Sequence, residues 1–388
     1  MPRRFLHMAS RHRGMRAYRK GIIVWCLMSA LLFAALPAVN WIFSGGTIPL
    51  ADTGRLFSLD LAHSYINRFL YRQGISGNSR RVVVGRQGWL FLGNHYDQVM
   101  DKTRGIEVAD TAPARMAASV RELKQRQDWL TGKGIMSLFV IAPNKHTTYS
   151  EFLPWDDPPP VRNFTDEFIA RARSVDLNLL DLRPIMLKAR SGSEPLYFET
   201  DSHWNAYGAY LGYRATLAAV NELYGAQIQA LTVTTQRWVA RGAGDLARLL
   251  KFDTLLDKDV DRDVHLSYQG SDAILCIQKL DIARLAPRGR CQKSRNRILA
   301  VHAHPQASFN QQALNRMNVL WLRDSFGNGN SKFYQQTFSR IWEVDYKHFA
   351  NLRWREVIGK LHPDLVIYQV AEREIHGPAF RPAAAEPN

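Results

Sequence analysis

The sequence predicts an α/β protein with a doubly wound, mostly parallel sheet. Two observations lead to this fold class. Near-continuous apolar runs, such as 135–141 and 365–370, have the composition of strands that are buried on both faces of a sheet. These runs alternate with segments of helical spacing, and this alternation is typical of parallel sheets that helices cover on both faces. A chain of 388 residues is long enough for one such domain with accessory segments.

The amino-terminal segment predicts a membrane anchor. Residues 1–20 hold seven basic and no acidic residues, and the stretch from Gly21 to Phe43 has no charged residue. As a helix this stretch would be about 34 Å long, enough to span a bilayer, and the basic segment is expected on the cytoplasmic side. The alternative is a cleaved signal peptide, but its apolar core is usually shorter, and Leu36-Pro37-Ala38 is a poor cleavage site. We therefore expect an uncleaved anchor.

The basic balance of the chain suggests an anionic partner. The formal net charge is +16, which fits an anionic membrane surface, an acidic polymer or a nucleic acid. Seven of the basic residues precede the apolar stretch, where they orient the chain in a membrane. We therefore expect a membrane, and no nucleic acid, among the partners.

The region from about 253 to 296 predicts an insertion, because its periodicity fades and its charge rises. Cys276 and Cys291 lie within it, and a disulfide between them would close a loop of about 15 residues, worth about 3 kcal/mol. We favour this disulfide over two free thiols, while Cys26 fills space in the apolar stretch. The basic end of the insertion faces either an acidic polymer or solvent; its members are Arg284, Arg288, Arg290, Lys293, Arg295 and Arg297. No Cys/His cluster has zinc spacing, so no metal is expected.

The remaining elements follow in order along the chain. Residues 44–79 predict a linker and a peripheral helix, residues 80–375 predict the α/β domain, and the proline- and alanine-rich residues 376–388 predict a disordered tail. The domain begins with a hairpin at 82–92 around a tight glycine turn. Helices are then expected at 114–130, 164–173, 206–223 and 352–361, and strands at 135–141, 177–182, 317–322, 341–344 and 365–370.

Two short polar segments supply the parts of a hydrolase-type site. One residue separates Asp201 from His203, so the carboxylate can hold the imidazole in one tautomer for proton transfer. Ser325 lies just beyond the predicted strand 317–322, where His203 can activate it as a nucleophile. Each part also has a simpler interpretation, with Asp201 as a helix cap, His203 as a structural histidine and Ser325 as a turn residue. Both parts fall at strand ends or helix entrances of one sheet, which favours a joint site.

The motifs TDSHWNAYGA and WLRDSFGNG, taken in this order, resemble the SGNH-hydrolase-like domain of the alginate O-acetyltransferase family, which includes AlgJ and AlgX. In that family the acid and the histidine precede the serine, a permuted order relative to ordinary SGNH hydrolases, and this chain has the same order. The single anchor and the lack of a carbohydrate-binding extension after Glu374 resemble AlgJ more than AlgX. The long basic flank departs from the family, and the motifs do not identify the polymer. Further ordered matches between 80 and 375 are VGRQGWLFLG, APNKHTTYSEFLP, LLDLRP, GAGDLA and HPDLVIYQVAERE.

The resemblance implies a periplasmic enzyme, anchored in the inner membrane, that acetylates hydroxyls of an exopolysaccharide such as alginate. Asp201, His203 and Ser325 carry over as acid, base and nucleophile, with an acetyl-serine intermediate. It also implies partners, namely a membrane-bound O-acyltransferase and other proteins of polysaccharide acetylation and export. The acyltransferase would deliver the acetyl group from cytoplasmic acetyl-CoA, so this chain is expected to bind no cofactor itself.

A transferase also needs a groove that holds the polymer near the acyl group. Their position at strand ends suggests five residues that bind substrate in this groove, and a structural role is the alternative for each. These residues are Lys145, Trp204, Arg323, Tyr368 and Arg373. Asn144 and Asn205 are candidate oxyanion donors, and no sequence feature selects between them.

Two other functions are compatible with the same residues. A carbohydrate acetylesterase would release acetate instead of transferring it, and a scaffold of an acetylation or export complex would keep the fold without the chemistry.

Overall fold

The computed structural model describes residues 4–157, 159–160, 162–269, 275–281, 284, 286–294, 305–349 and 354–375. The predicted disordered tail at 376–388 lies outside the described residues, as do Arg295 and Arg297 of the predicted basic group. The chain divides into two compact units, Met1–Arg68 and Phe69–Asn388.

The N-terminal unit consists of helices. They are α1 (Arg4–Phe43), α2 (Thr53–Leu56) and most of α3 (Asp60–Arg72). The part of α1 from Tyr18 to Phe43 is long and apolar enough to cross a membrane, which fits the predicted anchor. The peripheral helix predicted within residues 44–79 is divided between α2 and α3. Asp52 begins α2, because its carboxylate accepts a hydrogen bond from the Arg55 backbone N–H at 3.1 Å.

An eight-stranded mixed sheet forms the centre of the second unit. Its strand order is β4-β3-β12-β10-β11-β9-β7-β8, in which β4 to β11 are parallel and the last three strands pair antiparallel. The strands are β3 (Met136–Ala142), β4 (Leu179–Asp181), β7 (Leu275–Asp281), β8 (Ala286–Ser294), β9 (Gln306–Phe309), β10 (Asn315–Arg323), β11 (Phe338–Asp345) and β12 (Leu365–Ala371). The predicted α/β class with a mostly parallel sheet is confirmed. The antiparallel edge was not predicted, because its strands are rich in polar and charged residues and lack a long apolar run.

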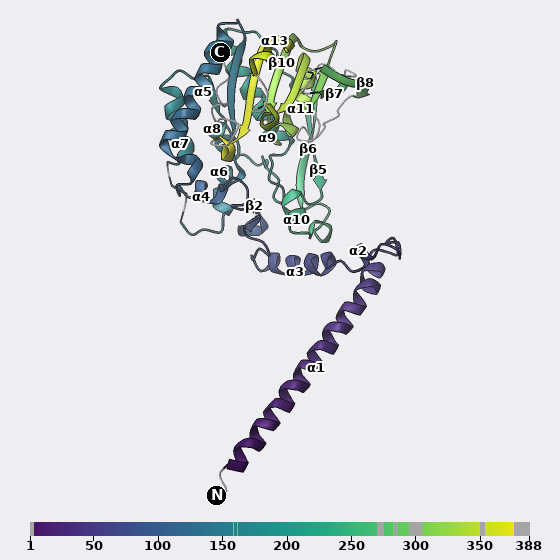
Figure 1. Ribbon diagram of the computed structural model, residues 1–388. Coiled ribbons are helices and arrows are strands. Elements are labelled where there is room, and N and C mark those ends of the chain that lie inside the picture. The colour runs from purple at the N-terminus through teal and green to yellow at the C-terminus, as the bar shows by residue number, and fades with distance from the viewer. Residues whose placement is uncertain are drawn as a thin grey trace. The chain divides into compact units, whose positions relative to one another are not determined.

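Helices cover both faces of this sheet. α9 (Ala206–Tyr224) and α11 (Gly327–Thr337) pack on one face. α5 (Pro113–Thr131), α7 (Phe164–Arg173) and α13 (Trp354–Leu361) pack on the other, and α5 and α7 lie together at the end of the sheet away from β7 and β8 (Figure 1). Successive residues of a strand point to opposite faces, so Val140 belongs to the first apolar core and Ile141 to the second. This double burial explains the near-continuous apolar runs.

The region predicted as an insertion contributes to two sheets. Its β6 (Asp261–Gln269) forms an antiparallel ribbon with β5 (Thr232–Arg241), and β7 and β8 extend the main sheet. A disulfide between Cys276 and Cys291 joins β7 to β8. The smaller elements include the predicted hairpin, β1 (Val82–Val84) with β2 (Leu90–Leu92), and the short helices α4 (Val99–Thr103), α6 (Lys145–Thr148), α8 (Arg183–Ala189), α10 (Asp245–Leu249) and α12 (Tyr346–Phe349).

The topology brings three strand ends together. The chain moves from β3 outward to β4 and later from β10 outward in the opposite direction to β11, while β12 returns between β3 and β10. Open α/β sheets bind their ligands at such a switch point, beyond the carboxyl ends of the strands. Asn144 follows β3, Ser325 follows β10 and Arg373 follows β12, so the sheet gathers these residues at one edge.

Candidate active site

The segment Thr200–Asn205 presents an acid and an imidazole at the entrance of α9. Asn205 is the N-cap of that helix, because its Oδ1 accepts hydrogen bonds from the backbone N–H groups of Tyr207 and Gly208, both at 3.0 Å. An isolated β-bridge between Tyr197 and Trp204 closes the turn that carries Asp201 and His203. This local framework turns both side chains to the same side.

The turn after β10 presents the serine. Asp324 Oδ1 accepts a hydrogen bond from the Phe326 backbone N–H at 2.9 Å, and its Oδ2 accepts one from the Ala371 N–H at 2.6 Å, so the turn is bound to the end of β12. Gly327 allows α11 to begin close to Arg323, since a Cβ there would lie 2.1 Å from Arg323 Cδ. Ser325 itself remains half-buried, at the surface of the site.

Hydrogen bonds join these two segments into a chain of three side chains. Ser325 Oγ lies 2.8 Å from His203 Nε2, and His203 Nδ1 lies 2.8 Å from Asp201 Oδ1. Asp201 Oδ1 also accepts a hydrogen bond from the His203 backbone N–H at 3.1 Å. Ser325 and His203 are 122 residues apart in the sequence, so this contact is a product of the fold. The arrangement has the geometry of a nucleophile, a base and an orienting acid.

The electrostatics of the site favour a base that can take a proton. Burial alone would lower the pKa of His203, but the hydrogen bond and charge of Asp201, together with the charge of Asp245, raise its pKa above the ordinary value. Burial would raise the pKa of Asp201, but His203 and Arg241 together hold it far below its ordinary value. Arg241 Nη2 lies 3.2 Å from Asp201 Oδ2. Asp201 therefore stays ionised and stabilises the imidazolium that forms when His203 accepts a proton.

A second carboxylate, Asp245, lies on the same side of the histidine. Asp245 Oδ2 is 3.6 Å from His203 Nδ1 and accepts a hydrogen bond from Ser202 Oγ at 2.6 Å. Gly244 makes this approach feasible, since a Cβ there would lie 2.3 Å from Asp201 Cβ. The sequence marked GAGDLA only as a family match, and no spacing rule links Asp245 to His203 over this distance in the chain.

The same three groups, Asp201, His203 and Asp245, could by geometry hold a metal ion, because one ligand atom from each lies within 4.8 Å of the others. Their hydrogen bonds describe a different role. His203 Nδ1 faces two carboxylates and is therefore the protonated nitrogen, which cannot ligate a cation, while its Nε2 faces Ser325.

Lys145 was predicted in the substrate groove, and the structure corrects this. It is almost fully buried, and its ammonium donates hydrogen bonds to three backbone carbonyls, those of Phe198 and Glu199 at 3.0 Å and that of Asp201 at 2.7 Å. Burial lowers the pKa of Lys145 to about 8, although nearby carboxylates, Asp261 first among them, act to raise it. Lys145 therefore fixes the loop that carries Asp201.

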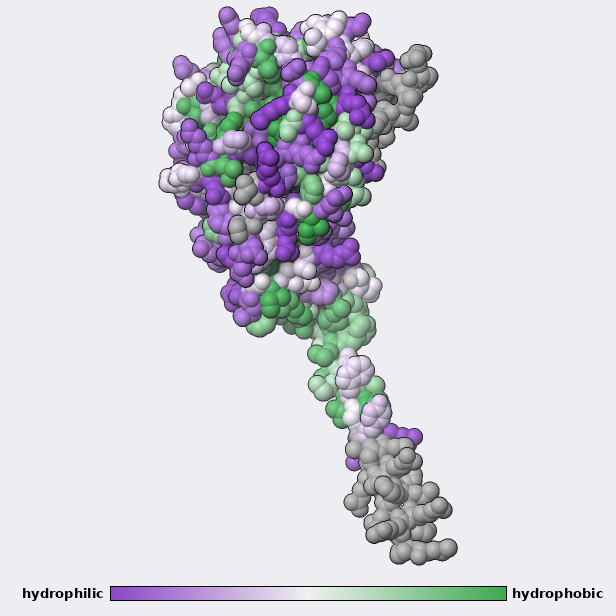
Figure 2. Space-filling view, turned by 90° about the vertical axis from the view of Figure 1, so that its left-hand side faces the viewer, coloured by the Kyte–Doolittle hydropathy of each residue, from purple (hydrophilic) through white to green (hydrophobic). Residues whose placement is uncertain are grey.

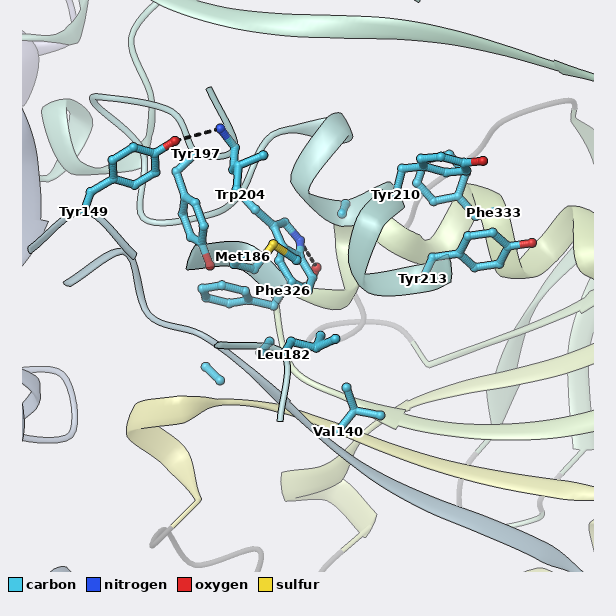
Figure 3. Close-up of a cluster of buried hydrophobic side chains, with 14 of the residues drawn as sticks. Val140, Tyr149, Leu182, Met186, Tyr197, Trp204, Tyr210, Tyr213, Phe326 and Phe333 are labelled. Atoms are coloured by element: carbon cyan, nitrogen blue, oxygen red, sulfur yellow. Dashed lines mark hydrogen bonds between the residues drawn. The ribbon is translucent and has the colours of Figure 1, made fainter. Parts of the chain in front are cut away.

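Three further groove predictions are wrong for the same reason, which is burial. Trp204 lies inside the domain against Phe326, and its Nε1 donates a hydrogen bond to the Phe326 carbonyl at 2.9 Å (Figure 3). Arg323 is completely buried and pairs with Glu343, with Nη2 3.0 Å from Oε2. Tyr368 stacks on Phe139 in the core, with ring centroids 4.4 Å apart. The sequence showed that these residues lie near strand ends, but it did not show on which side of the backbone their side chains lie.

Of the two predicted oxyanion donors, the structure removes Asn205. It is buried, its Oδ1 caps α9, and its Nδ2 donates to the Pro195 carbonyl at 2.7 Å, so the side chain is held in the helix cap. Asn144 remains, because among the described residues no acceptor lies against its Nδ2, while its Oδ1 accepts a hydrogen bond from Arg373 Nη1 at 3.3 Å. The Ser325 backbone N–H likewise has no acceptor within the described part of the chain.

Arg373, the fifth residue predicted in the groove, lies beside the nucleophile turn. Its guanidinium is 5.5 Å from the ring centroid of Phe326, the residue after Ser325. Arg373 is largely buried, and its Nε has no hydrogen-bond partner among the described residues. Together with Asn144 it lines a small cavity that holds about 20 Å³. Arg373 therefore stays a candidate substrate-binding residue.

The α/β fold and the Asp201–His203–Ser325 site resemble those of an SGNH hydrolase-like domain, and comparison with known proteins agrees with this resemblance. Residues 82–269 match the family model described as "SGNH hydrolase-like domain, acetyltransferase AlgX". This match includes Asp201, His203 and Asp245 and ends before Ser325. Among solved structures, PatB1 of Bacillus cereus has a TM-score of 0.56 at 16% identity, over 77% of this chain and 98% of that one. The O-acetyltransferase domain of Pseudomonas putida AlgJ has a TM-score of 0.50 at 17% identity, over 76% and 92%.

The more particular resemblance, to the alginate O-acetyltransferases, is also confirmed. The chain is 25% identical over 192 residues to a protein of Pseudomonas fluorescens described as "Probable alginate O-acetylase AlgJ". The match covers 48% of this chain and 45% of the relative, so the chain spans less than half the length of the curated relative that it matches. Both this relative and the family model point to AlgJ/AlgX-like acetyltransferases, as the sequence motifs predicted.

Proposed function

We propose that this protein is an O-acetyltransferase that acetylates hydroxyls of an alginate-like exopolysaccharide outside the inner membrane. The observation that carries the proposal is the hydrogen-bonded chain from Asp201 through His203 to Ser325, with 2.8 Å at each side-chain contact. The matches to the AlgX family model and to AlgJ favour acetyl transfer to a polysaccharide over the many other reactions of SGNH hydrolase-like domains.

The first half-reaction forms an acetyl-enzyme. Ser325 Oγ attacks the carbonyl carbon of the acetyl donor while its proton moves to His203 Nε2, 2.8 Å away. The bond between the acetyl carbon and the donor's leaving atom then breaks, and the proton on Nε2 passes to that leaving atom. Asp201 compensates the positive charge of the imidazolium during this step.

The second half-reaction transfers the acetyl group to the sugar. A sugar hydroxyl gives its proton to His203 Nε2, and its oxygen attacks the acetyl carbon; the ester bond to Ser325 breaks, and Oγ recovers the proton. Both half-reactions develop a negative charge on the former carbonyl oxygen. The Ser325 backbone N–H and Asn144 Nδ2 are the donors that we assign to this oxyanion, because neither has another acceptor among the described residues.

Arg373 is the residue that we assign to the acceptor. Its buried guanidinium lies beside Phe326, and its Nε has no hydrogen-bond partner among the described residues, although Asp97 Oδ2 lies 3.9 Å away; such a group suits a carboxylate-bearing sugar such as a uronate. The other parts of the proposal concern the setting: α1 as an inner-membrane anchor, the catalytic domain in the periplasm, and a membrane-bound O-acyltransferase that supplies the acetyl group, so that no cofactor is held by this chain. α1 supports the anchor by its length and composition.

The test uses the purified full chain with 4-nitrophenyl acetate as donor and an oligomannuronate as acceptor. The wild-type protein should acetylate the oligosaccharide, and mass spectrometry should find the acetyl group on Ser325 after a short reaction. Ser325→Ala should abolish both products. Ser202→Ala is the matched control, because Ser202 Oγ also lies near the ring, 3.2 Å from His203 Nδ1, but on the side away from Nε2. It should keep the acetyl-Ser325 adduct.

Two results would overturn the proposal in favour of its alternatives. Release of acetate without any acetylated oligosaccharide, under conditions in which the acceptor saturates the enzyme, would identify an acetylesterase. An unchanged level of polymer acetylation in cells that carry Ser325→Ala, with normal protein abundance, would identify a scaffold.

A further inference from the structure

Apolar side chains of helix α3 are exposed at the surface. Leu59, immediately before it, and Tyr65, Ile66 and Phe69 within it are 53%, 46%, 54% and 64% exposed. At 100° per residue these positions fall on one arc of the helix. Ser64, Asn67 and Arg68 fall on the opposite arc and are half-buried. A surface helix of a water-soluble domain has the reverse arrangement, with its apolar side toward the protein.

Contacts within the N-terminal unit place the start of α3 at the end of α1. Asn40, in the last turn of α1, donates hydrogen bonds from Nδ2 to the carbonyls of Leu56 and Ser58, at 2.6 and 2.9 Å. The rings of Phe43 and Tyr65 meet edge to face, with centroids 6.1 Å apart. The chain between the two helices therefore folds back onto the last turns of α1, and the apolar arc of α3 begins at the level where α1 ends.

That level corresponds to the surface of a bilayer. The segment Tyr18–Phe43 has 26 residues, which at 1.5 Å per residue gives about 39 Å, longer than the roughly 30 Å of bilayer hydrocarbon. The last turns of α1, with Trp41 and Phe43, therefore reach the headgroup region, where aromatic residues are favoured. Figure 2 shows apolar side chains over much of the described surface of the N-terminal unit.

We infer that α2 and α3 form an interfacial collar around the end of the anchor, with the arc of Leu59, Tyr65, Ile66 and Phe69 inserted among the lipids. Helices of this kind bury their apolar side about 5–10 Å below the headgroups. Arg55 and Arg72 flank the arc and can pair with lipid phosphates. The partner is thus the lipid surface itself, and the collar would hold the domain boundary at Arg68 close to the membrane.

The chain suits a test by single cysteines. It has three cysteines, of which Cys276 and Cys291 form a disulfide, so Cys26→Ala gives a background without a free thiol. In the full-length protein, a cysteine at Leu59, Ile66 or Phe69 is labelled with the fluorophore NBD, and cysteines at Asp60, Ser64 and Asn67 are the matched controls on the polar arc. Each labelled chain is reconstituted into phosphatidylcholine–phosphatidylglycerol vesicles and must keep the thermal unfolding midpoint of the background protein.

Two quenchers then report the surroundings of each site. Lipids brominated near the headgroup should quench the three apolar-arc sites strongly and the polar-arc sites weakly, with a helical period, and aqueous iodide should give the opposite order. Equal quenching of both arcs by iodide would place α3 in water and overturn the inference. Apolar-arc sites that neither quencher reaches would identify a protein covering the arc, which would also overturn it. The proposed acetyl transfer does not enter this test.

Discussion

The two halves of the candidate active site are held in different ways. The acid–base half, Thr200–Asn205, is fixed by side chains from distant parts of the chain. Lys145 donates hydrogen bonds to the Asp201 carbonyl and to the carbonyls of Phe198 and Glu199, just before this segment. Arg241 contacts the Asp201 carboxylate. The nucleophile half, Arg323–Gly327, is fixed by the strands beside it in the sheet. There the main anchor is the buried pair of Arg323 with Glu343 on the neighbouring strand β11.

This difference indicates what each half contributes. The position of Ser325 follows from a strand end and a turn, which are part of the core, so disturbing it should cost stability first. The orientation of His203 depends on a polar network that is complete only in the folded domain, so disturbing it should cost activity first. The five predictions below test this division, beginning with the largest effect.

Asp201→Asn should have the largest effect on activity. The amide can donate to His203 Nδ1 and so favours the tautomer with the proton on Nε2, which cannot accept the Ser325 proton. We expect kcat to fall by about 10³–10⁴, as for the equivalent change in other triads, with little change in the unfolding midpoint. Asp245→Asn is the control, since its carboxylate lies 3.6 Å from Nδ1, against 2.8 Å for Asp201. Equal losses in the two variants would mean that the carboxylates share the orienting role.

Arg323→Met should have the largest effect on stability. It leaves Glu343 buried without its cation, and such a loss typically costs about 3–5 kcal/mol. Urea unfolding of the variant in detergent measures this cost. The double variant with Glu343→Gln should recover part of it, because the uncompensated charge is then gone.

Lys145→Met provides the comparison from the acid–base half. It removes a buried cation and leaves carbonyls, not a charge, without a partner, so about 1–3 kcal/mol should be lost. Its activity should fall more than its stability suggests, since the loop that carries Asp201 loosens. The division of roles would be contradicted if Lys145→Met were less stable than Arg323→Met and had the same activity as Arg323→Met.

The same division explains what the sequence could reveal. The strands that carry the apolar cores, and the helices between them, were predicted closely, because burial on both faces leaves a continuous apolar pattern; α7 (Phe164–Arg173) was predicted at its observed ends. The antiparallel edge and the β5–β6 ribbon were missed, because exposed polar strands carry no such pattern.

The site was predicted to a similar extent. Asp201, His203 and Ser325 stood out by local spacing, and the fold brings them into contact. Asp245 and Arg241 were missed, because their link to the histidine exists only in three dimensions. Trp204, Arg323 and Lys145 were correctly placed near the site but assigned to a groove, since sequence does not show whether a polar side chain at a strand end points to solvent or into the domain.

The pH dependence should separate the two halves through the charges that face His203. Asp245, on the acid–base half, raises the pKa of His203, and Arg373, beside the nucleophile turn, lowers it. His203 must be neutral to accept a proton, so the acid limb of kcat/KM reports its pKa in the free enzyme. Asp245→Asn should move this limb to lower pH and Arg373→Gln to higher pH. Shifts in the same direction would show that the variants act through a change of structure.

Trp204→Phe should have the smallest effect, because it removes one direct link between the halves and leaves their separate anchors in place. The lost hydrogen bond from Nε1 to the Phe326 carbonyl is worth about 1 kcal/mol, and the smaller ring adds a modest packing loss. A slight displacement of Ser325 from His203 should lower kcat by about tenfold or less. Trp238→Phe on the β5–β6 ribbon, where Trp238 packs on Tyr207, is the control with the same change of size. If both variants lower stability equally and neither changes kcat, Trp204 serves packing alone, and the two halves are aligned by the sheet.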